Sequence, residues 1–175
     1  MSPYHGGTIA TAFLFLLLIS TAGAVTGPVA YLNNINQFLA PQNAARSALR
    51  LRPLIWDQRL ARYARRYANQ RRLDCALRHS DGPYGENIFW GSGFGWTPAQ
   101  AAAAWVSERK WYDYGSNSCE GGQECGHYTQ VVWRSTRRVG CARVTCFGGR
   151  GVFMTCNYDP PGTISGRSLT ELSPN

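Results

Sequence analysis

Two histidines, His79 and His127, and two glutamates, Glu86 and Glu108, carry the side chains best suited to metal or acid–base chemistry in this sequence. Neutral imidazole nitrogens and carboxylate oxygens form a ligand set that suits zinc, copper or another divalent metal. The sequence therefore predicts a site in which these four residues meet. No H-E-x-x-H motif fixes the ligands on one helix, so a structural hydrogen-bond network of the same side chains is the alternative.

The segment around His127 predicts how its ring is held. Cys119 and Cys125 enclose a Gly-Gly pair in the run C-E-G-G-Q-E-C-G-H, which suits a small disulfide-closed loop. Residues 129–133 are rich in β-branched and aromatic side chains, which favours a strand. We therefore expect His127 at the mouth of a sheet, whose rigid edge can aim the imidazole. A structural histidine at a loop–strand junction is the alternative.

Capping residues and apolar periodicity predict three helices before that segment. The first covers about residues 42–49. Asp57 is the expected N-cap of the second, which runs to about residue 72 with an apolar stripe opposite an arginine-rich face. The run Thr97-Pro98-Ala99-Gln100 forms a capping box that opens the third, which reaches about residue 110 and carries Glu108 near its end.

The remaining pattern predicts the fold class. Residues 78–96 are rich in glycine and interrupted by proline, so we expect a long loop there. Residues 129–133, 140–145 and 152–157 are predicted strands separated by turns. Helices followed by strands predict an α+β domain with an antiparallel sheet.

The amino-terminal segment predicts secretion. Residues 9–19 form an apolar run that is too short to span a bilayer, and small residues follow at 22–24. We interpret residues 1–24 as a cleaved signal peptide, which leaves one domain at 25–162 and a carboxyl-terminal extension at 163–175.

All six cysteines lie after the signal peptide, and an even count in a secreted chain predicts three disulfides. Many pairings are possible, and proximity in the chain favours only Cys119 with Cys125.

The formal net charge is +8, and nearly all of the basic residues are arginine. Such a charge favours anionic surfaces, for example microbial membranes or acidic wall polymers. Secretion argues against nucleic acid as a partner. A solvated helix face is the simpler explanation for much of the arginine.

Five motifs extend over most of the domain: Y-A-N-Q-R at 67–71, H-S-D-G-P-Y-G-E-N at 79–87, W-V-S-E at 105–108, G-H-Y-T-Q-V-V-W at 126–133 and C-N-Y-D-P-P-G at 156–162. Together they resemble the plant pathogenesis-related class 1 proteins, basic type, of the CAP superfamily (cysteine-rich secretory, antigen 5, pathogenesis-related). The resemblance implies a three-layer αβα sandwich, the CAP fold, and a secreted defence protein with antifungal or anti-oomycete activity.

The resemblance also implies particular residue roles. His79, Glu86, Glu108 and His127 match the four cavity positions of the family, where some members bind zinc or another divalent metal. The family's disulfides, carried over by order, would join Cys75 to Cys146, Cys119 to Cys125 and Cys141 to Cys156. We expect a monomer.

The aromatic loop that contains Phe89, Trp90, Phe94 and Trp96 lies in the region that resembles the family's sterol-binding motif. Aromatic rings between glycines would form a flexible slot for a flat apolar ligand such as a sterol of a pathogen membrane. The alternative is that two or three of these rings simply cover the core.

Three features of the chain depart from the family pattern. Gln42 stands where a histidine is usual, Thr163 stands where the signalling-peptide motif has asparagine, and the final Pro-Tyr is missing. Release of an immune-signalling peptide that begins at Pro160 is therefore a weaker hypothesis. The extension at 163–175 is a candidate vacuolar sorting segment, as an alternative to residence in the apoplast.

The leading hypothesis is a binding protein rather than a catalyst, in which the aromatic loop captures sterols. The rival is a metal-dependent hydrolase with His79 and His127 as ligands. Glu86 or Glu108 would then be the general base.

Overall fold

The computed structural model describes Met1 and residues 28–162. Its centre is a four-stranded sheet with the strand order β1-β5-β6-β2. The strands are β1 (Ile55–Trp56), β2 (Gly85–Gly91), β5 (Arg138–Thr145) and β6 (Val152–Asp159). β1 runs parallel to β5, and the other neighbours are antiparallel. The sheet is therefore mixed rather than wholly antiparallel as predicted, because the short edge strand β1 is parallel to β5.

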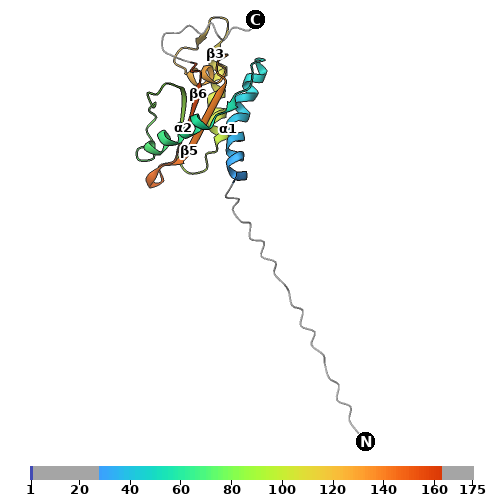
Figure 1. The fold of residues 1–175 in the computed structure, drawn as a ribbon, viewed down its shortest axis with the longest axis vertical. Coiled ribbons are helices and arrows are strands. Elements are labelled where there is room, and N and C mark those ends of the chain that lie inside the picture. Colours follow the sequence, from blue (N-terminus) through green and yellow to red (C-terminus); the bar gives the residue numbers. More distant parts are fainter. Residues whose placement is uncertain (2–27, 163–175) are drawn as a thin grey trace.

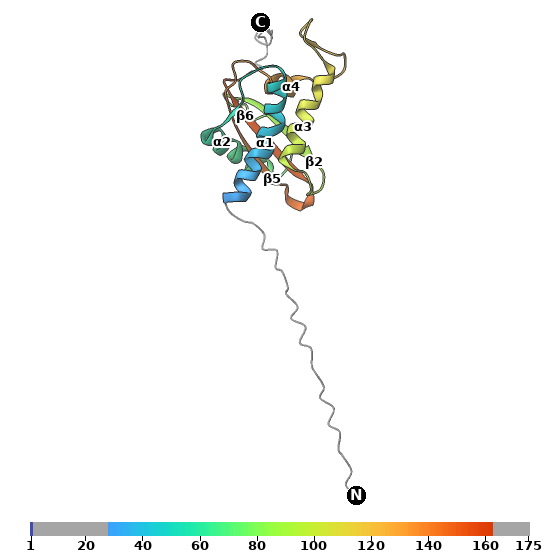
Figure 2. The same cartoon turned by 90° about the vertical axis from the view of Figure 1, so that its right-hand side faces the viewer.

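Helices cover both faces of this sheet (Figure 1). α2 (Gln58–Arg71) packs on β5 and β6 from one side. The other side carries α1 (Pro28–Ala48), α3 (Pro98–Ser107) and α4 (Gly126–Val131), and Figure 2 shows α1 and α3 next to each other. The expected three-layer αβα sandwich is confirmed.

Four short elements complete the order. They are the 3-10 helices η1 (Glu108–Trp111) and η2 (Phe147–Gly149), and the paired strands β3 (Tyr112–Asp113) and β4 (Ser118–Cys119).

The N-caps of α2 and α3 are as predicted. The Asp57 carboxylate accepts hydrogen bonds from the main-chain N of Arg59 and Leu60. Thr97 and Gln100 form the reciprocal capping box of α3. Gly140 of β5 lets α2 approach closely, because a Cβ at that position would lie 2.1 Å from the Ala61 N.

The two faces of the sheet support separate clusters of buried side chains. Phe153 of β6 packs in the cluster beneath α2, whereas Met154, next in the chain, packs in the larger cluster beneath α1, α3 and α4. The alternation follows from the pleat, which points successive side chains to opposite faces. Because both faces are covered, β6 is buried along almost its whole length.

The strand predicted at residues 129–133 is wrong. Residues 126–131 form the short helix α4, although Val131 and Val132 favour strands. Both valines are fully buried, so packing against the larger cluster outweighs local propensity.

The predicted loop at 78–96 and the first helix also need correction. Residues 85–91 form β2, because every residue of the segment pairs with β6. The first helix begins at Pro28 rather than near residue 42 and continues through Pro41. Phe38 and Gln42, on either side of that proline, are buried, and this packing offsets the lost main-chain hydrogen bond.

The three disulfides implied by the family resemblance are present: Cys75–Cys146, Cys119–Cys125 and Cys141–Cys156. Within the described residues, no helix is long and apolar enough to cross a bilayer. The predicted signal peptide and the carboxyl-terminal extension lie outside the described residues, apart from Met1.

Candidate functional site

A cavity of about 710 Å³ opens where β2 and α4 begin. Residues 79–87, residues 124–127 and Pro161 line it. His79, Glu86 and His127 therefore share one cavity, although they come from distant parts of the chain. Glu108, the fourth predicted residue, contacts His127 directly.

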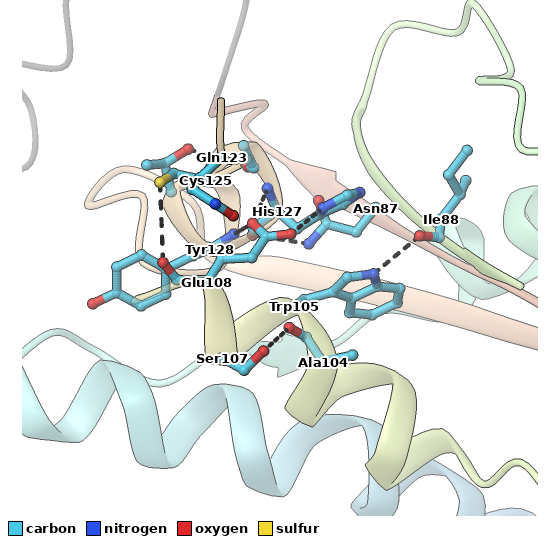
Figure 3. Close-up of polar contacts among 12 residues, drawn as sticks. Asn87, Ile88, Ala104, Trp105, Ser107, Glu108, Gln123, Cys125, His127 and Tyr128 are labelled. Atoms are coloured by element: carbon cyan, nitrogen blue, oxygen red, sulfur yellow. Dashed lines mark hydrogen bonds and ion pairs between the residues drawn. The ribbon is translucent and has the colours of Figure 1, made fainter. Parts of the chain in front are cut away.

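Glu108 holds His127 in a fixed orientation. Its Oε1 lies 2.6 Å from the ring Nδ1, and its Oε2 accepts hydrogen bonds from the main-chain N of His127 and of Tyr128, each at 3.1 Å (Figure 3). The Cys125 side chain, at the N-cap position of α4, makes no capping bond. Glu108 therefore caps α4 in its place, and its negative charge suits a helix N-terminus.

Two further contacts position the ring and main chain of His127. The Trp105 indole stacks on the imidazole, with ring centroids 6.4 Å apart and planes inclined by 21°. The Trp105 Nε1 donates to the Ile88 carbonyl at 3.0 Å, and the Asn87 Nδ2 donates to the His127 carbonyl at 3.0 Å (Figure 3). His127 is thus supported by α3 and β2 together.

His79 and Glu86 form a second pair on the same cavity. The His79 Nδ1 lies 2.9 Å from the Glu86 Oε1, which also accepts from the Ser80 N at 2.8 Å. The Glu86 Oε2 accepts from the Asn157 Nδ2 at 3.1 Å. Because Glu86 lies on β2 and Asn157 on β6, this carboxylate is held by the sheet.

These hydrogen bonds shift the pKa values of the pair. Burial alone would raise the pKa of Glu86, but hydrogen bonds from His79, Ser80 and Asn157 outweigh it and lower the pKa below its usual range. The hydrogen bond from His79 to Glu86 raises the pKa of His79, against a smaller opposing effect of burial. At neutral pH Glu86 is therefore ionised, which favours a proton on the His79 Nδ1.

A buried chain of polar groups lies behind His127. The Tyr158 hydroxyl donates to the Gln42 Oε1 at 2.8 Å and accepts from the Asn87 Nδ2 at 3.2 Å. Asn87 in turn donates to the His127 carbonyl, so Gln42 is connected to the site through two side chains.

Arg46 supports the other end of α4. Its guanidinium is fully buried, and its Nη1 donates to the carbonyls of Val131 and Trp133 at 2.9 and 2.8 Å. Other donors reach the carbonyls of Arg52 and Thr136. Burial lowers the pKa of Arg46 to about 10. Sequence reasoning did not identify this residue, because a single arginine beside a helix pattern looks like a surface residue.

The carboxylate of Glu124 joins Glu108 and His127 in a group of metal-type ligands. One ligand atom from each of the three lies within 4.8 Å of the others. Among the described residues this group includes neither His79 nor Glu86. Glu124 was not among the predicted site residues, because its approach to Glu108 depends on how the disulfide-closed loop folds.

The aromatic loop is divided between the core and solvent. Phe89 and Trp96 meet edge to face with ring centroids 5.2 Å apart and pack against the larger cluster. Trp90 and Phe94 remain exposed, with 41% and 62% of their surface accessible. The Arg143 guanidinium donates to the carbonyls of Phe94 and Trp96 at 2.9 and 3.0 Å, so the loop is anchored.

Comparison with known proteins identifies related sequences. The chain matches the cysteine-rich secretory protein family, CAP, over residues 39–158. It is 59% identical over 162 residues to the pathogenesis-related protein PR-1 of Medicago truncatula, covering 87% of this chain and 92% of that protein. It is 51% identical over 156 residues to the pathogenesis-related protein PRMS of Zea mays, covering 89% and 93%.

Solved structures show the same fold. The crystal structure of NaASP2 with Zn²⁺ has a TM-score of 0.62 and 25% sequence identity, and the match covers 78% of this chain and 84% of that one.

Proposed function

Because the chain belongs to the cysteine-rich secretory protein (CAP) family and, within it, to the plant pathogenesis-related PR-1 proteins, we propose that it is a secreted, basic defence protein that inhibits fungi or oomycetes by binding their sterols. The similarity to the pathogenesis-related PR-1 proteins supports the defence role. The net charge of +8 supports assignment to the basic type. Three disulfides among the described residues suit an oxidising extracellular compartment such as the apoplast, with the vacuole as the alternative destination.

The observation that carries the sterol proposal is the exposure of Trp90, near the end of β2, and of Phe94, on the anchored loop that follows. Large aromatic side chains gain free energy when a flat apolar molecule covers them. Phe89 and Trp96 hold the loop from the core side, so the two exposed rings lose little conformational freedom on binding.

Ergosterol binding to the purified protein tests this proposal. We expect binding by the wild type, a marked loss in the Trp90→Ala/Phe94→Ala variant, and unchanged binding in Ile55→Ala, which removes an exposed apolar group elsewhere. Unchanged binding by the double variant would contradict the loop assignment. The sterol site would then be sought in a second cavity of about 310 Å³ beside α1, lined in part by Ile35, Phe38 and Trp56.

Growth inhibition tests the mechanism separately. If the protein acts by depleting sterol, an excess of added ergosterol restores growth of the treated fungus. Inhibition that persists under saturating sterol would rule out this mechanism.

We also propose that the cavity binds a divalent metal such as zinc. The residues fit, because a glutamate engages the Nδ1 of each histidine and leaves the Nε2 available, as in many metal-binding histidines. His127 and Glu124 would hold the ion, with His79 across the same cavity. A bound zinc would supply Lewis acidity toward an oxygen ligand.

A metal-dependent hydrolase is the second candidate, favoured by the group of Glu108, Glu124 and His127. Both oxygens of Glu86 and of Glu108 accept hydrogen bonds from the protein, which favours a positioning role for these two carboxylates. Glu124 is exposed on the cavity wall and is the better candidate for a general base.

Ester and peptide substrates test the hydrolase. Turnover that chelation abolishes, zinc restores and Glu124→Gln removes would support it. Turnover that is unchanged by the chelator or by Glu124→Gln would contradict it.

A further inference from the structure

Three exposed apolar side chains gather at the end of the sheet where β5 ends and β6 begins. Leu73 follows α2, Phe94 follows β2, and Phe147 lies in the hairpin between β5 and β6, with 68%, 62% and 49% of their surfaces accessible. The hairpin projects at the lower end of the folded domain in Figures 1 and 2. We call these three side chains the apolar tip.

The loops that carry the tip are fastened to one another. The Cys75–Cys146 disulfide joins the segment after α2 to the hairpin, and the Phe147 N donates to the Arg72 carbonyl at 2.9 Å. The Phe94 ring lies against the hairpin, since a Cβ at Gly149 would be 3.5 Å from it. The tip is therefore a preformed surface, and its loops lose little conformational entropy on docking.

Arginines surround the tip. The Arg72 guanidinium lies over the Phe147 ring at 4.5 Å, the Arg150 Nη1 donates to the Leu73 carbonyl at 3.4 Å, and Arg143 donates to the Phe94 carbonyl at 2.9 Å. The exposed face of α2, which runs from the far end of the sheet toward the tip, carries further arginines in this order: Arg59, Arg62, Arg65 and Arg66.

Acidic side chains are scarce at this end of the domain. Among the described residues near the tip, the acidic one is Asp74, which pairs with Arg71 at 3.4 Å. Asp57 and Asp159 lie at the opposite end of β5, where both contact Arg138. Glu86, Glu108 and Glu124 belong to the cavity. Of these acidic side chains, only Asp74 therefore lies near the tip.

We propose that the apolar tip and its arginines form a docking surface for an anionic phospholipid bilayer. Exposed leucine and phenylalanine side chains insert at the boundary between headgroups and acyl chains, and flanking arginines attract anionic headgroups. A protein partner would have to present a defined acidic surface that matches this basic, apolar one. A bilayer needs only the combination of charge and apolar groups found here.

Docking through the tip orients the molecule. β2 begins at the cavity with Gly85 and Glu86 and ends near the tip at Gly91, which touches the hairpin at Gly151. The cavity therefore faces solution when the tip contacts a membrane. The proposal requires no sterol, and of the three tip side chains Phe94 belongs also to the aromatic loop proposed to bind sterol.

Sedimentation with vesicles tests the proposal on the full secreted protein. We compare vesicles of phosphatidylcholine alone with vesicles of phosphatidylcholine and phosphatidylserine, both free of sterol. We expect binding to the anionic vesicles only, weakened as salt is raised. Replacing Leu73 and Phe147 by serine should weaken binding roughly tenfold or more, because their apolar surface no longer enters the bilayer.

Matched controls separate the tip from general effects. Ile55→Ser removes an equally exposed apolar side chain at the far end of β5, and it should leave vesicle binding unchanged. Arg150→Gln should weaken binding several-fold, whereas Arg109→Gln, with the same net charge, should not. Leu73 and Phe147 lie outside the aromatic loop, so ergosterol binding in free solution should persist in their variant.

Three results would overturn the proposal. The first is a wild-type protein that does not bind anionic vesicles. The second is a Leu73→Ser/Phe147→Ser variant that binds them as well as the wild type. The third is a change of oligomeric state in that variant without any change in vesicle binding, which would assign the tip to a protein–protein contact.

Discussion

Glu108 and His127 are joined twice, because one carboxylate oxygen lies 2.6 Å from the ring Nδ1 and the other accepts a hydrogen bond from the His127 N at 3.1 Å. The first contact orients the imidazole, and the second begins α4. One side chain thus combines a structural role with a functional one. A substitution of Glu108 therefore cannot by itself separate chemistry from folding.

We expect Glu108→Ala to lower the free energy of unfolding by about 1–2 kcal/mol, because α4 loses its N-terminal cap. Glu124→Gln should weaken zinc binding while leaving that free energy unchanged, since Glu124 is exposed. Urea denaturation and zinc titration of both variants measure the two effects. Equal stability of Glu108→Ala and the wild type would show that the cap contributes nothing.

The His79–Glu86 pair predicts a pH dependence. The pKa of His79 is raised, so its hydrogen bond to Glu86 stabilises the fold fully below the ordinary histidine pKa of about 6.5 and is lost as the pH rises through the raised value. The pKa of Glu86 is lowered, so its contribution to stability is complete above the ordinary value of 4.5 and is lost as the pH falls through the lowered value.

NMR titration of the metal-free protein measures the His79 pKa directly. We expect a value above 6.5 that falls toward 6.5 in Glu86→Gln, with a smaller fall in Asp81→Asn, a weaker contributor. A titration of His79 that is unaffected by Glu86→Gln would show that the pair does not form in solution.

Arg46 should be among the most sensitive positions in the protein. Arg46→Met removes a donor from four main-chain carbonyls, of which those of Trp133 and Thr136 keep a second one, so the free energy of unfolding should fall by roughly 3–5 kcal/mol. Arg46→Lys should give an intermediate loss, because one ammonium cannot reach all four. Arg62→Met on the exposed face of α2 is the control and should change stability little. Equal stability of Arg46→Met and Arg62→Met in thermal and chemical denaturation would contradict this prediction.

The peptide-precursor hypothesis predicts a cut between Asp159 and Pro160, and the contacts beyond that bond oppose it. The Thr136 Oγ1 donates to the Pro160 carbonyl at 2.8 Å, and the Gly162 N donates to the buried Gln130 Oε1 at 2.9 Å. We expect mass spectrometry of the secreted protein to find this bond intact. We also expect Gln130→Ala to be cut faster by added protease. A fragment that begins at Pro160 in the untreated wild type would contradict this expectation.

The helices with strong local signals were predictable from the sequence. α2 and α3 were predictable because Asp57 and Thr97 are strong caps ahead of regular helix patterns. α4 was not, because Val131 and Val132 favour strands and only packing against distant segments makes the segment helical. β2 was not predicted, because the segment 78–96 is rich in glycine. Its pairing with β6 depends on residues far along the chain.

The candidate site shows the same division. The sequence predicted that His79, Glu86, Glu108 and His127 meet, and the structure places His79, Glu86 and His127 on the wall of one cavity. The grouping of Glu124 with Glu108 and His127 depends on where the disulfide-closed loop folds back, which no local pattern reveals. Gln42 was equally out of reach, because its link to His127 passes through Tyr158 and Asn87.

The six residues of α4 are too few to hold a helix in water, where isolated helices shorter than about 12–15 residues are marginal. Its first turn depends on Glu108 and its last on Arg46, which lies 85 residues before Val131. We therefore expect α4 to form late in folding, after α1 and α3 have docked. A chain trapped before that step would lack the ordered His127 wall, so only fully folded molecules would present a complete cavity.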